Sequence, residues 1–213
     1  MASGLSSQVD AEPGRPGIPG WAALWRNPLP DVGGRPAVRW VCRLLTSVSR
    51  WQLREMHGLE HVAAAGDPFI LALNHSQRPE AVLVPAWLCY HRQGRLVHFM
   101  ADWNFLLVPG LAWVIRLHDP IVVVRKPAKP AFLNRYKSRF EGGRKPLEEA
   151  RVRLAAGRSV GIFPEATVNR HPDELLRGQQ GVARLAIEAG VPVVPGGIRF
   201  LPSRRPGPIR DLE

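Results

Sequence analysis

The sequence contains little cysteine and no apolar run long enough to cross a membrane as a helix. Its 213 residues include only Cys42 and Cys89, too few for the disulfide framework of a small secreted domain. The longest apolar stretch, Phe105–Ile115, is broken by Pro109 and Gly110, whereas a spanning helix needs about 20 apolar residues. We therefore expect a protein of a reducing compartment without a spanning helix.

Acidic residues are also scarce. The chain has 18 Asp and Glu against 29 Lys and Arg, which gives a formal net charge of +11. Such an excess favours an anionic partner, for example a phospholipid surface, a phosphorylated or acidic substrate carrier, or a nucleic acid. Because the arginines are scattered and not interleaved with aromatic residues along one element, we expect no nucleic-acid partner.

Motifs for a bound metal, a nucleotide or a nucleophilic serine are missing or out of context. The sequence has no P-loop and no G-x-G-x-x-G, and Gly58 interrupts the pair His57 and His61. A G-x-S-x-G pattern surrounds Ser159, but a predicted helix precedes it and a predicted strand follows, the reverse of a nucleophile elbow. We expect no metal, no bound cofactor and a structural role for Ser159.

Composition divides the chain into three parts. Residues 1–36 are rich in proline and glycine and predict a flexible arm. Residues 37–57 predict a basic amphipathic helix, and residues 58–213 predict the main folded domain.

Apolar runs predict buried strands at 68–73, 121–124 and 159–163, further strands at 191–194 and 198–201, and helices at 80–91, 145–156 and 179–189. This alternation predicts a single α/β domain with a largely parallel or mixed sheet flanked by helices.

Two stripes recur at helical spacing within residues 37–57. The basic stripe is Arg39, Arg43, Arg50 and Arg54, and the apolar stripe is Val41, Leu44, Val48 and Trp51. Such a helix suits an anionic membrane interface, and it equally suits a surface helix packed on its own core. The net charge and the tryptophans favour the membrane. Because the N-terminus has no signal-peptide layout, we expect a cytoplasmic protein bound peripherally at the inner face of the membrane.

A histidine and a carboxylate follow the first predicted strand. His75 and Glu80 lie five positions apart in the segment N-H-S-Q-R-P-E, and Pro79 suits the first turn of a helix. The carboxylate can orient one imidazole nitrogen and leave the other as a general base for a substrate hydroxyl. The motif taken by itself is equally consistent with a surface histidine and a helix-capping glutamate.

A second carboxylate follows the strand predicted at 159–163. Glu165 lies in the segment F-P-E-A-T, at the end of a strand where open α/β sheets bind ligands. If the strands are parallel, this loop and the His75 turn open at the same edge of the sheet.

These blocks resemble the glycerophosphate and lysophospholipid acyltransferase family. The pattern H-x4-D/E, the pattern F-P-E-x-T and the segment Val191–Pro195 occur in the family's order, and Phe99–Arg125 resembles the block between the first two. The resemblance covers about Gly58–Phe200. It implies transfer of an acyl group from a thioester, acyl-CoA or acyl carrier protein, to a hydroxyl of a lysophospholipid-like acceptor. It further implies that His75 is the base, that Glu80 orients it, and that these residues bind the acceptor: Arg125, Phe163, Pro164, Glu165, Thr167 and Arg170.

The sequence departs from the family's pattern at four positions. Glu80 stands where the family usually has Asp, and Ala166 stands where it usually has Gly. Val168 stands where the family usually has Arg, and the nearest arginine, Arg170, comes two residues later. Asp102 stands where many members have a lysine. Because phosphate-binding cations are missing or displaced, we expect lysophosphatidic acid not to be the best acceptor.

The sequence also bears on the C-terminal end of the domain and leaves two alternative functions open. Many relatives continue beyond the fourth block, so the acyltransferase domain at residues 58–213 is expected to be shortened at its C-terminal end. One alternative function is a non-catalytic basic membrane-binding protein that retains the fold. The other is a lipid esterase or thioesterase that uses Ser159 or water.

Overall fold

A computed structural model describes residues 15–32, 35–171, 173–200 and 207–210 of the chain. Five strands form one sheet in the order β3–β2–β4–β1–β5, and every pairing is parallel. The strands are β1 (Ile70–Leu73), β2 (His98–Asp102), β3 (Ile121–Val123), β4 (Val160–Ile162) and β5 (Val193–Gly196). The predicted α/β domain is confirmed, and the sheet is wholly parallel. Residues 198–200 of the strand predicted at 198–201 are not in a strand, and residue 201 lies outside the described residues.

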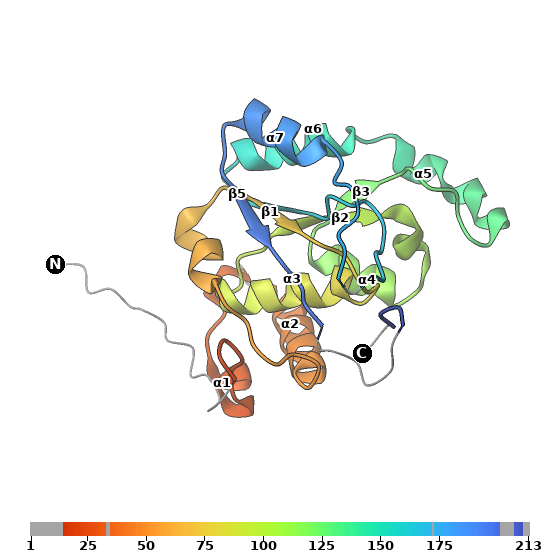
Figure 1. Cartoon of the computed structure of the whole chain (residues 1–213). Coiled ribbons are helices and arrows are strands. Elements are labelled where there is room, and N and C mark those ends of the chain that lie inside the picture. Colours follow the sequence, from red (N-terminus) through yellow and green to blue (C-terminus); the bar gives the residue numbers. More distant parts are fainter. Residues whose placement is uncertain (1–14, 33–34, 172, 201–206, 211–213) are drawn as a thin grey trace.

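Helices cover both faces of the sheet (Figure 1). On one face, α6 (Pro146–Ala155) and α7 (Gly181–Ala189) share a core with Ile70 of β1. On the other face, α3 (Glu80–His91) shares a core with Leu71 of the same strand. Successive residues of a strand point to opposite faces, so a continuous apolar strand is what a sheet covered on both sides requires.

The segment 15–32 is packed against the domain, so the prediction of a flexible arm over residues 1–36 is wrong for this part. It contains α1 (Trp21–Arg26), and Ile18 and Leu24 are fully buried in a core with Trp87 of α3. The hydroxyl of Tyr90 also donates to the carbonyl of Ala23 at 3.1 Å. The local proline and glycine content did not reveal these distant apolar partners. Residues 1–14 lie outside the described residues.

The helix predicted at 37–57 is shorter in the structure. It forms α2 (Pro36–Ser49), so Arg50 caps its end and Arg54 lies beyond it. The side chain of Arg43 donates to the carbonyl of Asn27 at 2.8 Å, and that of Arg50 to the carbonyl of Pro19 at 3.0 Å. Two members of the predicted basic stripe therefore hold the N-terminal segment in place, and the four do not form one helical face.

One face of α2 packs on α3 and the opposite face is apolar and exposed. The Cys42 thiol donates to the carbonyl of Ala86, and the Trp87 indole donates to the Ser49 hydroxyl, so this side faces α3. Of the predicted apolar stripe, Val41 is buried. The outer apolar face of α2 consists of Trp40, Leu44 and Val48, which are 55–60% exposed, and Trp51, 68% exposed, follows just beyond the end of the helix.

Short helices fill the connections. They are the 3₁₀ segments η1 (Pro30–Val32), η2 (Leu59–Val62), η3 (Ala64–Gly66), η4 (Trp103–Leu107) and η5 (Ala131–Tyr136), and the α-helices α4 (Leu111–Leu117) and α5 (Ser138–Glu141). Among the described residues, none of the helices has the length and hydropathy that crossing a membrane requires.

Candidate active site

The turn between β1 and α3 brings His75 against Glu80. The imidazole Nδ1 lies 2.9 Å from Oε2 of Glu80, and the same oxygen accepts the backbone N–H of Ser76 at 2.8 Å. Glu80 is the first residue of α3, where the helix dipole favours a negative charge. The side chains of His75 and Glu80 are only 12% and 9% exposed. A carboxylate at Nδ1 fixes the proton on that nitrogen and leaves Nε2 as the basic nitrogen.

Phe163, the residue directly after β4, packs against the imidazole of His75. Ala72 of β1 pairs with Ile162 of β4, so the segments that follow these two strands begin next to each other. The ring centroids of Phe163 and His75 are 4.3 Å apart, and the ring planes are 25° apart. The residue that the family resemblance assigned to the acceptor thus contacts the predicted base directly.

The loop after β4 turns back sharply at Ala166. Its φ of 54° is in the left-handed region, which explains why a glycine suits this position better than a residue with a Cβ. The Ala166 amide donates to the carbonyl of Phe163 at 3.0 Å, and the carbonyl of Pro164 accepts the amide of Gln179 at 2.8 Å. The turn buries Glu165 and leaves Thr167 exposed.

Asn169 is a connecting residue that the sequence analysis missed. Its backbone N–H donates to the carbonyl of His75 at 2.7 Å, which ties this loop to the His75 turn. Its side chain accepts the amide of His171 at 3.0 Å and donates to the carbonyl of Glu174 at 2.6 Å. Asparagine side chains commonly form hydrogen bonds with nearby backbone groups in turns. The position of Asn169 four residues after Glu165 could therefore have indicated that it holds this loop.

A cavity of about 500 Å³ opens at the carboxyl ends of β1, β4 and β5. Asn74 and Ser76 of the His75 turn line it together with Pro164 and Glu165. Glu165 is 7% exposed, and its Oε2 has no hydrogen-bond partner within the described part of the chain. Burial raises the pKa of the Glu165 carboxyl, because desolvation disfavours the charged form.

The two arginines assigned to the acceptor do not line this cavity. The Arg170 guanidinium donates to the carbonyl of Ile209 at 2.7 Å and so holds the described C-terminal segment. Arg125 is exposed after β3, at the far edge of the sheet from β5. The structure therefore brings Pro164 and Glu165 together with His75 and Glu80, and leaves Arg125, Thr167 and Arg170 outside.

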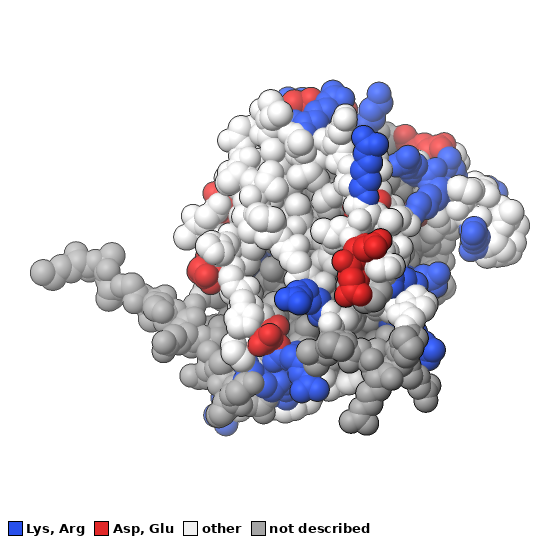
Figure 2. All heavy atoms as spheres, in the orientation of Figure 1, with Lys and Arg blue, Asp and Glu red and all other residues white. Residues whose placement is uncertain are grey.

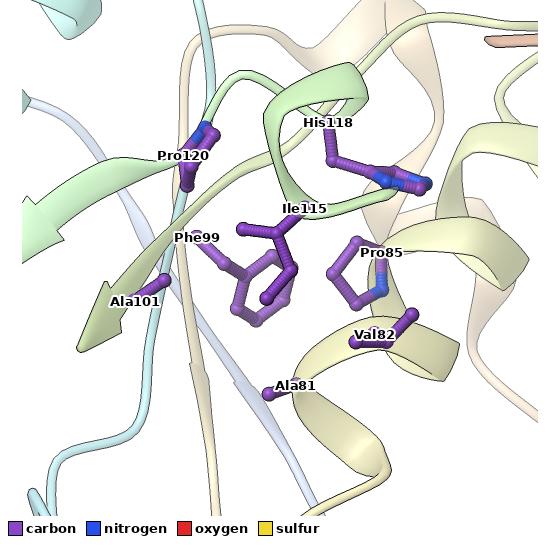
Figure 3. Close-up of a pocket in the computed structure, with 8 residues that line it drawn as sticks. All are labelled: Ala81, Val82, Pro85, Phe99, Ala101, Ile115, His118 and Pro120. Atoms are coloured by element: carbon purple, nitrogen blue, oxygen red, sulfur yellow. The ribbon is translucent and has the colours of Figure 1, made fainter. Parts of the chain in front are cut away.

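A second, much smaller cavity lies between α3, β2 and α4 (Figure 3). Its volume of about 10 Å³ holds no more than about one water molecule. Ala81 and Val82 line it next to Glu80, and Ile115 is its only lining residue from the apolar stretch 105–115. Within this stretch Leu106, Ala112 and Ile115 are buried in the core, whereas Val108 and Trp113 are 47% and 54% exposed.

Ser159 lies at the opposite edge of the sheet from His75. It directly precedes β4, is fully buried, and its hydroxyl donates to Asp67 and accepts the backbone N–H of Phe69 at 3.1 Å. Gly161 is needed in this segment because a Cβ there would lie 2.5 Å from the Phe99 ring. The G-x-S-x-G pattern is thus a feature of packing.

The fold and the site together define an α/β protein with a carboxylate-oriented histidine at the carboxyl edge of a parallel sheet. Residues 54–199 match the profile of the Acyltransferase family. Because this match spans more than half of the chain, the protein belongs to that family. The resemblance found from the motifs, and the prediction of an enzyme that transfers acyl groups, are confirmed.

Solved structures similar to the chain include that of an acyltransferase. It is the 1-acyl-sn-glycerophosphate (LPA) acyltransferase PlsC from Thermotoga maritima, with 20% sequence identity and a TM-score of 0.45. The match covers 75% of this chain and 56% of PlsC, so the chain spans just over half the length of that protein. No curated protein sequence matches the chain.

Proposed function

We propose that the protein transfers a fatty acyl group from a thioester, acyl-CoA or acyl carrier protein, to a hydroxyl of a lysophospholipid-like acceptor. The observation that carries this proposal is the hydrogen bond between His75 Nδ1 and Glu80 Oε2 at 2.9 Å, beside the cavity of about 500 Å³. A buried carboxylate that orients an imidazole is the arrangement that general-base catalysis requires.

In the proposed mechanism, Nε2 of His75 takes the proton from the acceptor hydroxyl. The oxygen then attacks the thioester carbonyl, and the tetrahedral intermediate collapses with loss of the thiol sulfur. The imidazolium returns its proton to that sulfur, so an ester and a free thiol are formed. Glu80 holds the Nδ1 tautomer and stabilises the transient imidazolium, and the scheme requires no metal or bound cofactor.

The acceptor would enter through the larger cavity. Pro164 and Glu165 line it and are the proposed acceptor contacts, while Phe163 positions His75. The backbone amide of Ser76 is occupied by Glu80, so it is not a free donor for the oxyanion.

We also propose that the protein binds peripherally to the inner face of a membrane through α1 and α2. The outer apolar face of α2 continues onto α1, because the rings of Trp25 and Trp40 are 5.5 Å apart and Trp21 is 57% exposed. Exposed tryptophans are typical of surfaces that lie at the membrane interface. An enzyme bound in this way would meet its lipid acceptor at the surface.

The test is an assay of radiolabelled acyl-CoA and acyl carrier protein with a panel of lysolipids. His75→Ala and Glu80→Ala are each expected to lower kcat by about 10²–10⁴-fold, and the double variant to be hardly worse than either. His61→Ala removes an exposed imidazole and is the matched control.

Wild-type activity in His75→Ala would refute the proposal. A wild type that binds vesicles but transfers no acyl group from either donor would favour the non-catalytic alternative.

A further inference from the structure

We propose that the acceptor carries a primary ammonium in its head group and that Glu165 binds this group in the larger cavity. This inference rests on the proposed function, since it names the class of acceptor that the same site would use. It follows from an unpaired buried carboxylate oxygen, from the charges that line the cavity and from the placement of the nearby cations.

The first observation is the state of the Glu165 carboxylate. The residue lines the cavity, is 7% exposed, and its Oε2 has no hydrogen-bond partner in the described residues. A buried carboxylate oxygen without a donor is unfavourable, and nearly all such groups in folded proteins are satisfied. A ligand that donates an N–H to Oε2 from the cavity would remove this penalty.

The second observation is the charge of the cavity lining. Glu165 is joined there by the exposed carboxylates Asp173 and Glu174, against one guanidinium among the described lining residues, that of Arg199. Figure 2 shows acidic atoms gathered where Figure 1 draws the loop between β4 and α7. An acidic lining attracts a cationic group and disfavours a head group that carries only phosphate.

The third observation is the placement of the cations next to this loop. Val168 is neutral, and the Arg170 guanidinium is directed to the carbonyl of Ile209. Among the described residues that line the cavity, Arg199 is the one whose guanidinium is left for a phosphate in the same head group, and Lys126 Nζ instead donates to the carbonyl of Ala166. One guanidinium and several carboxylates together match a zwitterionic head group better than a phosphate monoester.

The unpaired oxygen also selects among ammonium groups. A primary ammonium has three N–H donors, whereas a quaternary ammonium has none and offers only its charge. A preference of the protein for an ethanolamine over a choline head group therefore tests the hydrogen bond from the ammonium to Glu165. A preference for an ethanolamine head group over a bare phosphate tests the attraction of the positive charge.

The experiment compares kcat/KM for lysophosphatidylethanolamine, lysophosphatidylcholine and lysophosphatidic acid with a common acyl chain. Wild type is expected to prefer the ethanolamine lipid over each of the other two by about tenfold or more, because a site built to bind an N–H rejects analogues without it. Glu165→Gln is expected to reduce this preference about tenfold. The preference is measured as the ratio of kcat/KM for two acceptors, so a general loss of activity cancels.

A second variant protects the test against a folding defect at Glu165. The double change Asp173→Asn and Glu174→Gln alters two exposed side chains of the cavity lining, and it is expected to lower the ethanolamine preference a few-fold, because the lining loses two negative charges. Glu148→Gln, an exposed carboxylate on α6 away from the cavity, is the matched control and should leave all ratios unchanged.

A tenfold preference of wild type for lysophosphatidic acid, or an unchanged preference in both variants, would overturn the inference and leave the proposed function standing. Titration calorimetry of the same lysolipids without acyl donor separates the two proposals. Selective binding of the ethanolamine lipid without any acyl transfer would overturn only the proposed function, and equal binding of all three without transfer would overturn both.

Discussion

The ring of Phe163 lies nearly parallel to the ring of His75, with the centroids 4.3 Å apart. The imidazole is therefore held at two places, at Nδ1 by Glu80 and on one face by Phe163. The direction in which Nε2 points depends on both contacts. In the proposed mechanism, this contact would let Phe163 position the base, a role that can be separated from binding of the acceptor.

We predict that Phe163→Leu lowers kcat about tenfold, because a small displacement of a catalytic group is costly in rate. KM for the acceptor should change by much less, and Phe163→Tyr, which keeps the ring, should retain most of the activity. Steady-state kinetics on the three proteins provides the measurement, with Phe132→Leu as a control at a ring that is 61% exposed. A change in KM alone would mean that Phe163 binds the acceptor and does not position the base.

Ser159→Ala should affect stability and leave catalysis nearly intact. The change leaves the buried N–H of Phe69 without its acceptor and removes a donor to Asp67, which costs about 1–3 kcal/mol of unfolding free energy. Urea denaturation measures this loss, while kcat of the folded protein should stay within a few-fold of wild type. Ser138→Ala, at an exposed serine, serves as the control. Abolished activity in a fully folded Ser159→Ala protein would support the esterase alternative.

Ala166→Gly should stabilise the protein. At a φ of 54° an alanine carries a left-handed penalty of about 1–2 kcal/mol, which glycine avoids, and the greater freedom of glycine in the unfolded chain returns part of it. The expected gain is about 0.5–1 kcal/mol, measured by thermal or urea unfolding. Ala156→Gly, at an ordinary φ of −86°, should instead destabilise. If both changes destabilise equally, the turn is not strained.

Replacing Trp40 and Leu44 together by glutamine should weaken binding to vesicles of phosphatidylserine and phosphatidylcholine. Each large apolar side chain contributes about 1.5–3 kcal/mol when it is buried, so the combined change should weaken partitioning by about 100-fold or more. Co-sedimentation gives the bound fraction. Ile187→Gln removes an exposed residue from α7, on the other side of the sheet, and should have no effect (Figure 1). Unchanged binding of the double variant would show that another surface meets the membrane.

Several elements could be predicted from local pattern because their burial follows a local periodicity. The helix predicted at 80–91 has these same bounds as α3, and β1, β3 and β4 lie inside the apolar runs expected to form strands. Strand β2 (His98–Asp102) was not anticipated, because polar residues at both ends interrupt its apolar pattern. The spacing of His75 and Glu80 was also sufficient to predict their hydrogen bond, since both lie in one short turn.

Features that depend on residues distant in the chain were decided only by the tertiary structure. Phe163 reaches His75 because β4 pairs with β1, and composition could not reveal the core that buries Ile18 and Leu24. The arginine stripe was placed on one helix by spacing alone, but Arg43 and Arg50 find carbonyl partners in the preceding segment.

The sequence by itself determined the alternation of elements, the family motifs and the His75–Glu80 pair, because each of these is written in residues close together along the chain. The tertiary structure decided which strands are neighbours, which arginines are engaged elsewhere and which oxygen of Glu165 has no hydrogen-bond partner among the described residues. These outcomes depend on what each side chain meets after the chain has folded, and local spacing carries no information about such distant partners.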